Sequence, residues 1–476
     1  MRIKRLTGLL AALMFCALPA SGVRAADWVS LTELPIKQWQ MLSAKSSDPS
    51  PAYSPGIDRM KSEGGIASDM PIVINAKQYA HGIESHVMGD GRQGWTILEY
   101  DIEGLGYDTF SCTVGKAVAS SGLMANAQFY VYLDGKPAAE SPVIGCREDY
   151  YFEVDISGAK TLSLAAGDGG DGYSYDDVAW GNPVLYNKDS AVIESVRIEG
   201  TPYLVEQGGK VDFSRARALV RYASGAEKPV EIGELLIEAV STEEEGKLTV
   251  PFSYGGFSSE AEFYVVAPGR YAYLSDLEMK SWTMLENKSP VIDAIEDGVT
   301  PANLEGVAYA HGIWTHPTSD AASNGYGELV WDVSELGCTR FRATVGKPND
   351  TYCKYGQYHV YLDGKLLESS PVLYAGNAYV FDLDIRGGST LTLAVTGGEE
   401  SPDFYYWDST VWADPAVWAE ADVKPPIRFT VPDKVLWITA AALVALMGGS
   451  ALLYTLGTRQ EKKQREAGHE PEGGEK

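Results

Sequence analysis

Basic residues are scarce in this sequence. Its 476 residues include 39 Lys and Arg against 65 Asp and Glu, which gives a formal net charge of −26 at pH 7. A chain this acidic repels phosphate backbones and anionic lipid headgroups. The composition therefore argues against nucleic acid as a partner.

The motifs of common enzyme and metal sites are also missing. The sequence has no His-Glu-x-x-His or Cys-x-x-Cys pair for zinc, no Gly-x-Ser-x-Gly elbow and no phosphate-binding glycine loop. Asp176 and Asp177 are adjacent on a predicted strand, so their side chains point to opposite faces and cannot flank one glycosidic bond. We predict that the protein is not an enzyme.

The N-terminus predicts a cleaved export signal. Basic residues at positions 2, 4 and 5 precede an apolar run over residues 6–18. Val23-Arg24-Ala25 then provides the small residues that signal peptidase requires. We assign residues 1–25 to a signal peptide, so that the mature chain begins at Ala26.

A membrane span is predicted near the C-terminus. Residues 435–456 carry no charged side chain and are long enough to cross a hydrocarbon core of about 30 Å. Basic residues at positions 459, 462, 463 and 465 follow, and such a cluster favours the cytoplasmic side. The alternative is a buried core helix. The favoured topology is a single-pass plasma-membrane protein with an extracellular N-terminal ectodomain, a linker at 421–434 and a cytoplasmic tail at 457–476.

One module occurs twice in the predicted ectodomain, offset by about 230 residues. The matching elements keep their order and spacing over most of each copy, which indicates duplication of a whole domain. They are Tyr79–Ile83 with Tyr309–Ile313, Thr113–Lys116 with Thr344–Lys347, Val131–Lys136 with Val360–Lys365, and Trp180 with Trp412.

Each copy has the pattern of antiparallel β-structure. Apolar residues alternate with polar ones at Phe110, Cys112 and Val114, which is the period of a half-buried strand. Asp134-Gly135 and Asp363-Gly364 are dipeptides that favour tight hairpins. We predict an all-β fold of two antiparallel, jelly-roll-like β-sandwiches, at residues 26–189 and 268–420, followed by the single transmembrane helix.

The segment between the copies, residues 190–267, is also β-like but has a different pattern. Its alternating runs and the turn at Tyr254-Gly255-Gly256 resemble the bacterial immunoglobulin-like domains of surface proteins. The resemblance implies a third β-sandwich that spaces the two flanking copies.

The repeated module resembles the NPCBM domain, the family-51 carbohydrate-binding module first described beside a family-98 glycoside hydrolase. The shared elements in the first copy are Tyr79–His86, Phe110–Gly115, Val131–Lys136, and Asp176 with Trp180–Pro183; in the second they are Tyr309–His316, Phe341–Gly346, Val360–Lys365, and Asp408 with Trp412–Pro415. The resemblance implies a β-sandwich, often with a structural calcium, that binds galactose-type or related host glycans through loops at one end.

Candidate ligand residues follow from how proteins hold sugars, with aromatic rings on the apolar face and polar groups on the hydroxyls. In each copy a histidine precedes a variable loop, and an aromatic residue lies across that loop. The histidines could instead bond a turn and the aromatics cover the sandwich edge, while Trp180 and Trp412 fit the core. The candidates are His86, Arg92, Trp95 and Asp176 in the first copy and His316, Tyr326 and Asp408 in the second.

The segment Asp168–Gly172 resembles half of a calcium loop, with a plain hairpin turn as the favoured alternative. The metal ligands are otherwise unassigned.

The four cysteines that remain after signal cleavage form one pair in each copy, and neither pair has cysteine counterparts in the other copy. Because an exported protein can oxidise such pairs, we predict the disulfides Cys112–Cys146 and Cys338–Cys353. The alternative is buried thiols, since Cys112 shares the inward parity of Phe110 and Val114.

These observations favour a membrane-anchored bacterial surface protein that binds glycans through two modules. Two weak sites on one chain raise the effective concentration at a glycan-rich surface. A structural or protein-binding ectodomain that lacks sugar pockets is the second hypothesis, and a cryptic hydrolase is the third.

Overall fold

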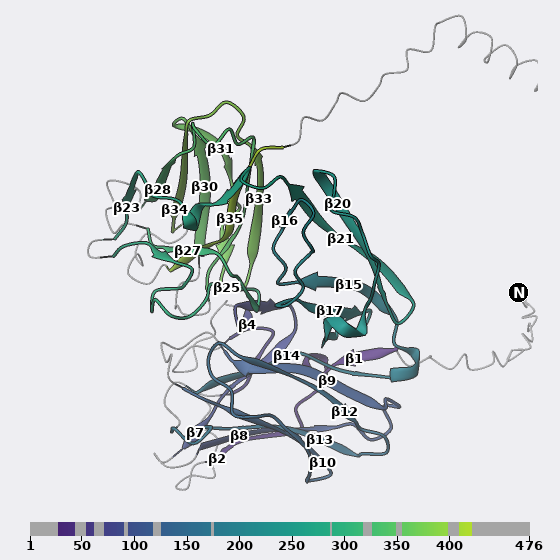
Figure 1. Cartoon of the computed structure of the whole chain (residues 1–476). Helices are drawn as coiled ribbons and strands as arrows, with labels where there is room; N and C mark the ends of the chain where they lie inside the picture. Colours follow the sequence, from purple (N-terminus) through teal and green to yellow (C-terminus); the bar gives the residue numbers. More distant parts are fainter. Residues whose placement is uncertain are drawn as a thin grey trace, which may run out of the picture. The chain divides into compact units, whose positions relative to one another are not determined.

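The computed structural model describes residues 27–42, 54–60, 71–89, 94–117, 125–172, 176–285, 288–317, 326–348, 355–397 and 409–420. Within these ranges the fold is all-β (Figure 1), as predicted. The helical elements there are short 3-10 turns: η1 (Leu31–Glu33), η3 (Lys188–Ser190), η4 (Ile232–Glu234) and η5 (Leu274–Asp276).

The first copy is a sandwich of two sheets. The first sheet has the order β12 (Asp149–Asp155), β9 (Thr109–Lys116), β14 (Asp177–Tyr186), β6 (Gly82–His86), β3 (Gly56–Ile57), with β1 (Trp28–Ser30) also on β14. The second sheet has the order β11 (Lys136–Glu140), β10 (Gln128–Leu133), β13 (Thr161–Gly167), β8 (Gly94–Asp101), β2 (Gln38–Leu42), with β7 (Met88–Gly89) also on β8. A hairpin, β4 (Ile72–Ile74) and β5 (Lys77–Tyr79), packs on the outer face of the first sheet.

The second copy repeats this order, apart from the additional short strand on its second sheet. Its first sheet runs β33 (Ala378–Asp384), β29 (Arg340–Gly346), β35 (Thr410–Trp418), β27 (Gly312–Thr315), β24 (Val291–Ile292), with β22 (Tyr271–Tyr273) on β35. Its second sheet runs β31 (Lys365–Ser369), β30 (Tyr355–Leu362), β34 (Thr390–Thr396), β28 (Gly327–Asp332), β23 (Ser281–Thr283), with β32 (Leu373–Tyr374) on β30. The small hairpin recurs as β25 (Asn303–Leu304) and β26 (Val307–Ala308).

The segment between the copies forms two smaller sheets. One has the order β15 (Ile193–Glu199), β17 (Arg217–Tyr222), β18 (Glu227–Val230). The other has the order β16 (Leu204–Glu206), β21 (Phe257–Val266), β20 (Gly246–Tyr254), β19 (Leu236–Ile237), in which β16 and β21 are parallel. The segment is therefore β-structure, and its likeness to bacterial immunoglobulin-like domains stays a prediction.

The two Asp-Gly dipeptides form the predicted hairpin turns. Asp134 and Gly135 have φ of 50° and 72°, and Asp363 and Gly364 have φ of 50° and 76°. Positive φ at both central residues is the requirement of a type I′ turn. The Asp134 carboxylate also accepts hydrogen bonds from the backbone N–H groups of Lys160 and Thr161, which ties the turn to β13.

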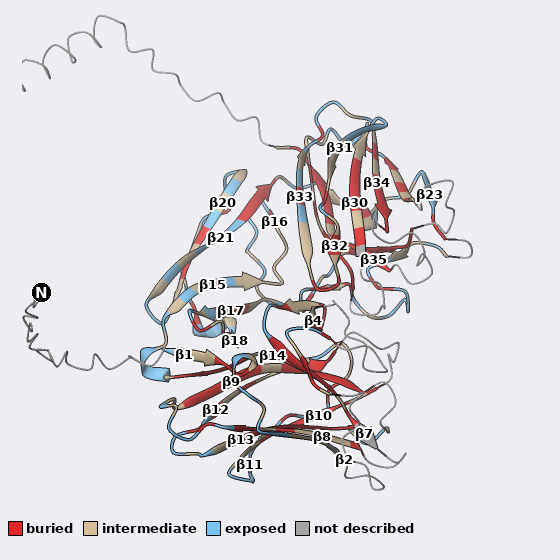
Figure 2. Cartoon of the chain, turned by 180° about the vertical axis from the view of Figure 1, so that it is seen from behind, coloured by how far each residue is buried: buried red, intermediate tan, exposed pale blue. Residues whose placement is uncertain are grey.

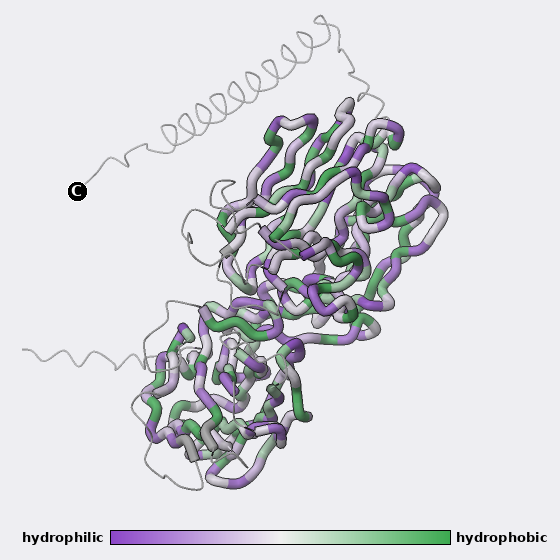
Figure 3. The backbone as a smooth tube through the Cα atoms, turned by 90° about the vertical axis from the view of Figure 1, so that its left-hand side faces the viewer, coloured by the Kyte–Doolittle hydropathy of each residue, from purple (hydrophilic) through white to green (hydrophobic). Residues whose placement is uncertain are grey.

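Each sandwich closes around a buried tryptophan. Trp180 is 0% exposed, and its ring meets Phe129 edge-on at 5.7 Å and 88°. Trp412 is also 0% exposed and meets Tyr358 at 5.4 Å and 84°. Figure 2 shows the buried residues along the central strands, and Figure 3 shows the alternation of hydrophobic and hydrophilic residues that places them there. The core interpretation of these two tryptophans is confirmed.

Several predicted features lie outside the described residues. They are the signal peptide, the linker, the span at 435–456, the tail, Arg92, Asp408 and Cys353. In the part of the chain that the structure describes, no helix is long and apolar enough to cross a membrane.

The predicted Cys112–Cys146 disulfide is wrong, because both residues are thiols in the structure. Cys112 lies in the core of the first copy, whereas Cys146 lies within electrostatic range of Lys116 at the end of β9 and donates to the Ala125 carbonyl at 3.5 Å. Lys116 is four residues beyond Cys112 on β9, or about 13 Å along the strand, which exceeds the reach of a disulfide. Cys338 is likewise a thiol.

We expect Trp180→Ala to lower the free energy of unfolding of the first copy by about 3–5 kcal/mol, because it removes a fully buried indole and leaves a cavity. Trp412→Ala should have an equal effect on the second copy. Urea denaturation followed by circular dichroism measures both effects. The matched control is Trp282→Ala, since Trp282 is 47% exposed; an equal loss in that variant would contradict the assignment of the cores.

Candidate functional site

A buried ion pair closes one end of the first sandwich. Lys116 is the last residue of β9, and Asp176 immediately precedes β14, the strand next to β9 in the sheet. Lys116 Nζ lies 2.7 Å from Asp176 Oδ1, and the two side chains are 2% and 0% exposed. Lys116 has the same strand parity as Cys112 and Val114, so its side chain points between the two sheets.

The environment of this pair is dry and acidic. Burial, with smaller contributions from the charges of Asp171 and Asp168, raises the pKa of Asp176 to about 7 against the lowering effect of Lys116. Asp176 Oδ2 has no hydrogen-bond partner among the described residues. Replacing buried ion pairs by apolar residues is often neutral or stabilising, so stability alone does not account for this pair.

Two hydroxyls extend the polar cluster at this end of the sandwich. Ser85 on β6 and Thr96 on β8 share a 2.7 Å hydrogen bond, and both side chains are 1% exposed. This bond joins the first sheet to the second at the same end of the sandwich as Lys116. The polar cluster therefore consists of Ser85, Thr96, Lys116 and Asp176.

The structure separates the predicted residues His86 and Trp95. His86 pairs with Asp177 across the first sheet, and its neighbour Val87 is in the core, so His86 points outward from that sheet. Trp95 is on the second sheet between buried Gly94 and Thr96, so its ring lies on that sheet's outer face. The two side chains therefore face away from each other on opposite sides of the sandwich.

The second copy keeps the buried lysine but differs around it. Lys347, the counterpart of Lys116, is 1% exposed. His316 is also 1% exposed, and its Nδ1 lies 2.7 Å from the Pro317 carbonyl, so the ring bonds a turn and has almost no surface for a ligand. Tyr326 lies on the outer face of the second sheet, as Trp95 does.

Asp168–Gly172 forms a turn whose carboxylates are held by backbone donors. Asp168 accepts from the N–H groups of Gly94 and Gly170, both at 3.0 Å, and Asp171 accepts from Asn126 at 2.9 Å. Calcium needs several oxygen atoms converging on one point. These residues fit the hairpin turn and do not fit a calcium site.

Another acidic group lies in the second copy, where ligand atoms of Asp276, Asp293 and His311 are within 4.8 Å of one another. This group does not suit calcium, because calcium takes oxygen ligands and the histidine offers a nitrogen. The ring of His311 stacks on Tyr273 at 3.7 Å, and Asp293 Oδ1 accepts from the Gly312 N–H at 3.1 Å. These contacts give His311 and Asp293 structural roles.

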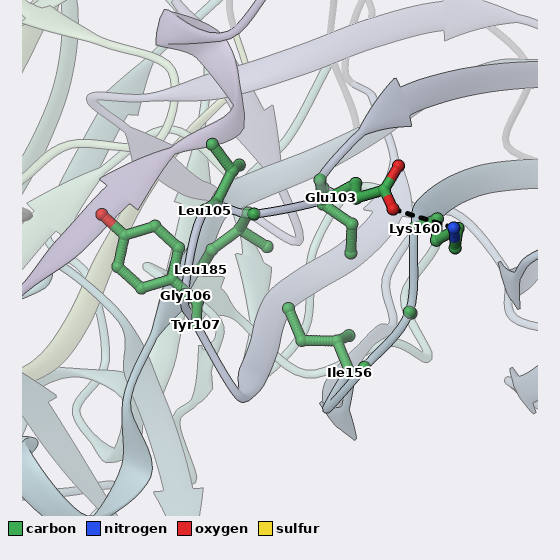
Figure 4. Close-up of a pocket in the computed structure, with 11 residues that line it drawn as sticks. Glu103, Leu105, Gly106, Tyr107, Ile156, Lys160 and Leu185 are labelled. Atoms are coloured by element: carbon green, nitrogen blue, oxygen red, sulfur yellow. Dashed lines mark ion pairs between the residues drawn. The ribbon is translucent and has the colours of Figure 1, made fainter.

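A cavity of about 310 Å³ lies at the opposite end of the first sandwich. Its walls come from the segment after β8 and from the β12–β13 turn, and Glu103 and Lys160 form a 2.8 Å ion pair at its edge (Figure 4). None of the predicted ligand residues lines it.

The sequence of this chain matches the model of the NPCBM/NEW2 domain at residues 37–186 and 270–418. The chain belongs to the NPCBM/NEW2 domain family. The matched ranges coincide with the two sandwiches and leave out the middle β-segment.

Solved structures similar to the two NPCBM copies include modules from bacterial enzymes. The M60 catalytic domain of Clostridium perfringens ZmpB with its CBM51-1 and CBM51-2 domains is 23% identical, over 83% of this chain and 39% of that one, with a TM-score of 0.30. The tandem CBM51 modules of the Streptococcus pneumoniae family 98 glycoside hydrolase are 17% identical, over 83% and 99%, with a TM-score of 0.28. The CBM51 of C. perfringens GH95 in complex with methyl-galactose is 24% identical, over 31% and 99%, with a TM-score of 0.26. No curated protein sequence matches the chain.

The buried lysine of each NPCBM copy was absent from the residues predicted from the sequence. Its signal was available, because Lys116 and Lys347 end the repeated Thr-Val-Gly-Lys element and continue the inward parity of the strand. A lysine at an inward position needs a buried partner. That requirement points to the repeated Asp176 and Asp408.

We expect Asp176 to make the stability of the first NPCBM copy depend on pH. Its folded pKa of about 7 lies above the usual value of 3.8, so the folded state keeps a proton that the unfolded state releases between these values. The stabilising contribution of Asp176 is therefore greatest below about pH 4 and falls as the pH rises through 7. The difference in unfolding free energy between wild type and Asp176→Asn should be larger at pH 4.5 than at pH 7.5, as measured by urea denaturation.

Exposed Asp189→Asn is the matched control and should show no such difference. An equal effect of Asp176→Asn at both pH values would contradict the raised pKa.

Proposed function

We propose that this protein binds glycans through its two NPCBM copies. The observation that carries the proposal is that both large sandwiches of the chain belong to one family, whose resemblance implies carbohydrate binding by loops at one end. The polar cluster supports a choice of end, because it lies between the sheets at the ends of β6, β9 and β14. The ligand would be a neutral or galactose-type host sugar.

In the first copy the binding groups would come from the loops next to the polar cluster. His86 is partly exposed at the end of β6, whereas its partner in the register, Asp177, is buried. An imidazole is a suitable partner for sugar hydroxyls. The buried Lys116–Asp176 pair would act as a positioning element that holds the ends of β9 and β14 together.

The second copy would bind differently or more weakly. His316 is buried against Pro317, so the group that occupies the His86 position is withdrawn from solvent. This difference favours unequal roles for the two copies. Two unequal sites on one chain still raise the effective concentration of the second site once the first is engaged.

A glycan array probed with the full chain tests the proposal. The array should include methyl-galactoside and N-acetylglucosamine, the sugars found in structures of similar C. perfringens modules. We expect binding to at least one glycan, and we expect His86→Ala to weaken apparent affinity by about tenfold through loss of one of two linked sites. Thermal unfolding should be unchanged.

Asp189→Asn is again the matched control and should bind as wild type does. Absence of binding to every glycan would contradict the proposal and favour the protein-binding alternative.

We also propose that the glycan-binding part is exported by residues 1–25 and held at the cell surface by residues 435–456. The charge-free stretch and the basic residues after it support this arrangement. Expressed in a bacterial host, the full chain should sediment with membranes and resist alkaline extraction. A chain that ends at residue 433 should be soluble after export, and recovery of the full chain in the soluble fraction would contradict the anchor.

A further inference from the structure

The outer face of the second sheet in the first copy carries a row of three aromatic rings. Trp95 on β8 lies 4.9 Å from Tyr130 on β10, and Tyr130 lies 6.4 Å from Tyr132 on the same strand, with interplanar angles of 34° and 33°. All three alternate with core residues along their strands, and all three are partly exposed. We name these residues the first aromatic row.

The rings of Trp95 and Tyr130 come together across the middle strand, β13, because the residues there are small. The register places Gly167 between Trp95 and Gln128, and Ala165 between Ile97 and Tyr130. A Cβ added to Gly167 would lie 3.7 Å from the Trp95 ring, so the indole lies over the strand. Ala165 is 0% exposed although its parity is outward, which shows that neighbouring side chains cover it.

The second copy repeats the row with different rings. Tyr326 lies 5.5 Å from His359, and His359 lies 6.4 Å from Tyr361, with interplanar angles of 37° and 45°. Tyr326 directly precedes β28, and the register of β30 and β34 places His359 and Tyr361 at the positions of Tyr130 and Tyr132. Ala394, the counterpart of Ala165, is also 0% exposed. Tyr326, His359 and Tyr361 form the second aromatic row.

Hydrogen bonds hold the middle ring of each row. The Tyr130 hydroxyl donates to Gln128 at 2.7 Å, and Gln128 in turn donates to the Ser141 carbonyl at 2.9 Å. His359 Nδ1 and Nε2 lie 2.7 Å from Ser369 Oγ and 3.3 Å from Thr396 Oγ1. His359 is only 7% exposed, and this burial lowers its pKa. Both middle rings are therefore fixed in orientation.

This face lies on the outside of the first copy. Figure 1 shows β8, β10 and β13 as the lower layer, and Figure 2 shows the same layer from behind. Among the described residues of the first copy, the core clusters take their members from the other face of this sheet. Cross-strand aromatic pairs stabilise a sheet, but that role does not require three clustered rings at the same positions of both copies.

We propose that the partly exposed rings of each aromatic row, Trp95, Tyr130 and Tyr132 in the first and Tyr326 and Tyr361 in the second, form a second binding surface for a neutral oligosaccharide. This surface is separate from the loop site and is reached by the next sugars of the same chain or by another chain. An aromatic ring stacks against the apolar face of a pyranose, and successive rings would meet successive sugars. The ligand class rests on the proposed function, and the surface itself rests on the geometry above.

The charges around the rows favour a neutral ligand over an acidic one. The carboxylates of Glu140 and Asp168 raise the pKa of Tyr130 after the larger effect of burial. At Tyr361 burial and the neighbouring Tyr326 raise the pKa most, and Glu328 adds a smaller effect. Each row therefore lies in a negative field, which repels sialylated or sulfated sugars. Amide and hydroxyl groups at the margins, such as Gln128, Gln357 and Thr392, can bond sugar hydroxyls.

Binding of the full chain to oligosaccharides of increasing length tests the proposal. The probes are mono-, di- and trisaccharides of galactose and of N-acetylglucosamine, with a sulfated galactose trisaccharide beside them. We expect the neutral trisaccharide of the bound series to bind about tenfold more tightly than its monosaccharide, and the sulfated one to bind no better than the monosaccharide. The variant Trp95→Ala/Tyr130→Ala/Tyr326→Ala/Tyr361→Ala should lose this length dependence and keep monosaccharide binding.

Two controls keep the result interpretable. Trp282→Ala removes an exposed tryptophan that belongs to neither row and should bind as wild type does. Tyr130→Phe/Tyr361→Phe keeps the rings and should keep the length dependence. If the fourfold variant unfolds at a lower temperature, the single variants Trp95→Ala and Tyr361→Ala replace it, each with a partial loss expected.

The outcomes separate this proposal from the proposed function. A wild-type chain that binds monosaccharides without length dependence, or a row variant that keeps it, overturns the aromatic rows as binding surfaces and leaves the loop site intact. A wild-type chain that binds none of the probes overturns both. Preference for the sulfated trisaccharide would overturn the assignment to neutral sugars.

Discussion

The packing of one buried indole between two sheets is the interaction on which each copy depends. Trp180 and Trp412 come from the long closing strand of the first sheet and meet an aromatic ring from the second sheet edge-on. Because neighbouring side chains of a strand point to opposite faces, placing this indole inward sets the direction of the side chains on β14 and β35 as far as the bulge that follows it. A shift of one residue would expose the indole, so the register is strongly specified.

That same parity explains both candidate binding regions. Along β9 it carries Phe110, Cys112 and Val114 into the core and then brings Lys116 inward, where it pairs with Asp176. Along β8 and β10 it places Trp95, Tyr130 and Tyr132 outward in one row. The polar cluster and the aromatic row thus result from the geometry of the core and need no special backbone.

The two copies show which positions tolerate change. The strand order, the Asp-Gly turns, the buried lysine and the central tryptophan are kept. The loop histidine becomes buried in the second copy, and the middle ring of the row changes from tyrosine to histidine while the pattern of three rings remains. Side chains that fill the core are under tighter steric constraint than those that face a loop or the solvent.

Several features could be predicted from the sequence alone: the all-β fold, the duplication, the two Asp-Gly turns and the core position of Trp180 and Trp412. These depend on local periodicity, dipeptide chemistry and size, all of which are visible in the printed residues.

The site could be predicted only in part. His86 and Trp95 are close along the chain, but they belong to different sheets and face opposite ways, because the chain crosses from one sheet to the other between them. The prediction of a Cys112–Cys146 disulfide was wrong for a similar reason. It rested on the absence of both cysteines from the second copy, and that absence says nothing about the distance between the two thiols. The sequence by itself determined which side chains alternate and where strands turn; the tertiary structure decided which distant strands become neighbours. The pairing of Lys116 with Asp176, and of Trp95 with Tyr130 across β13, depends on how strands distant in the sequence are aligned. Packing of the whole core stabilises that alignment over the alternatives.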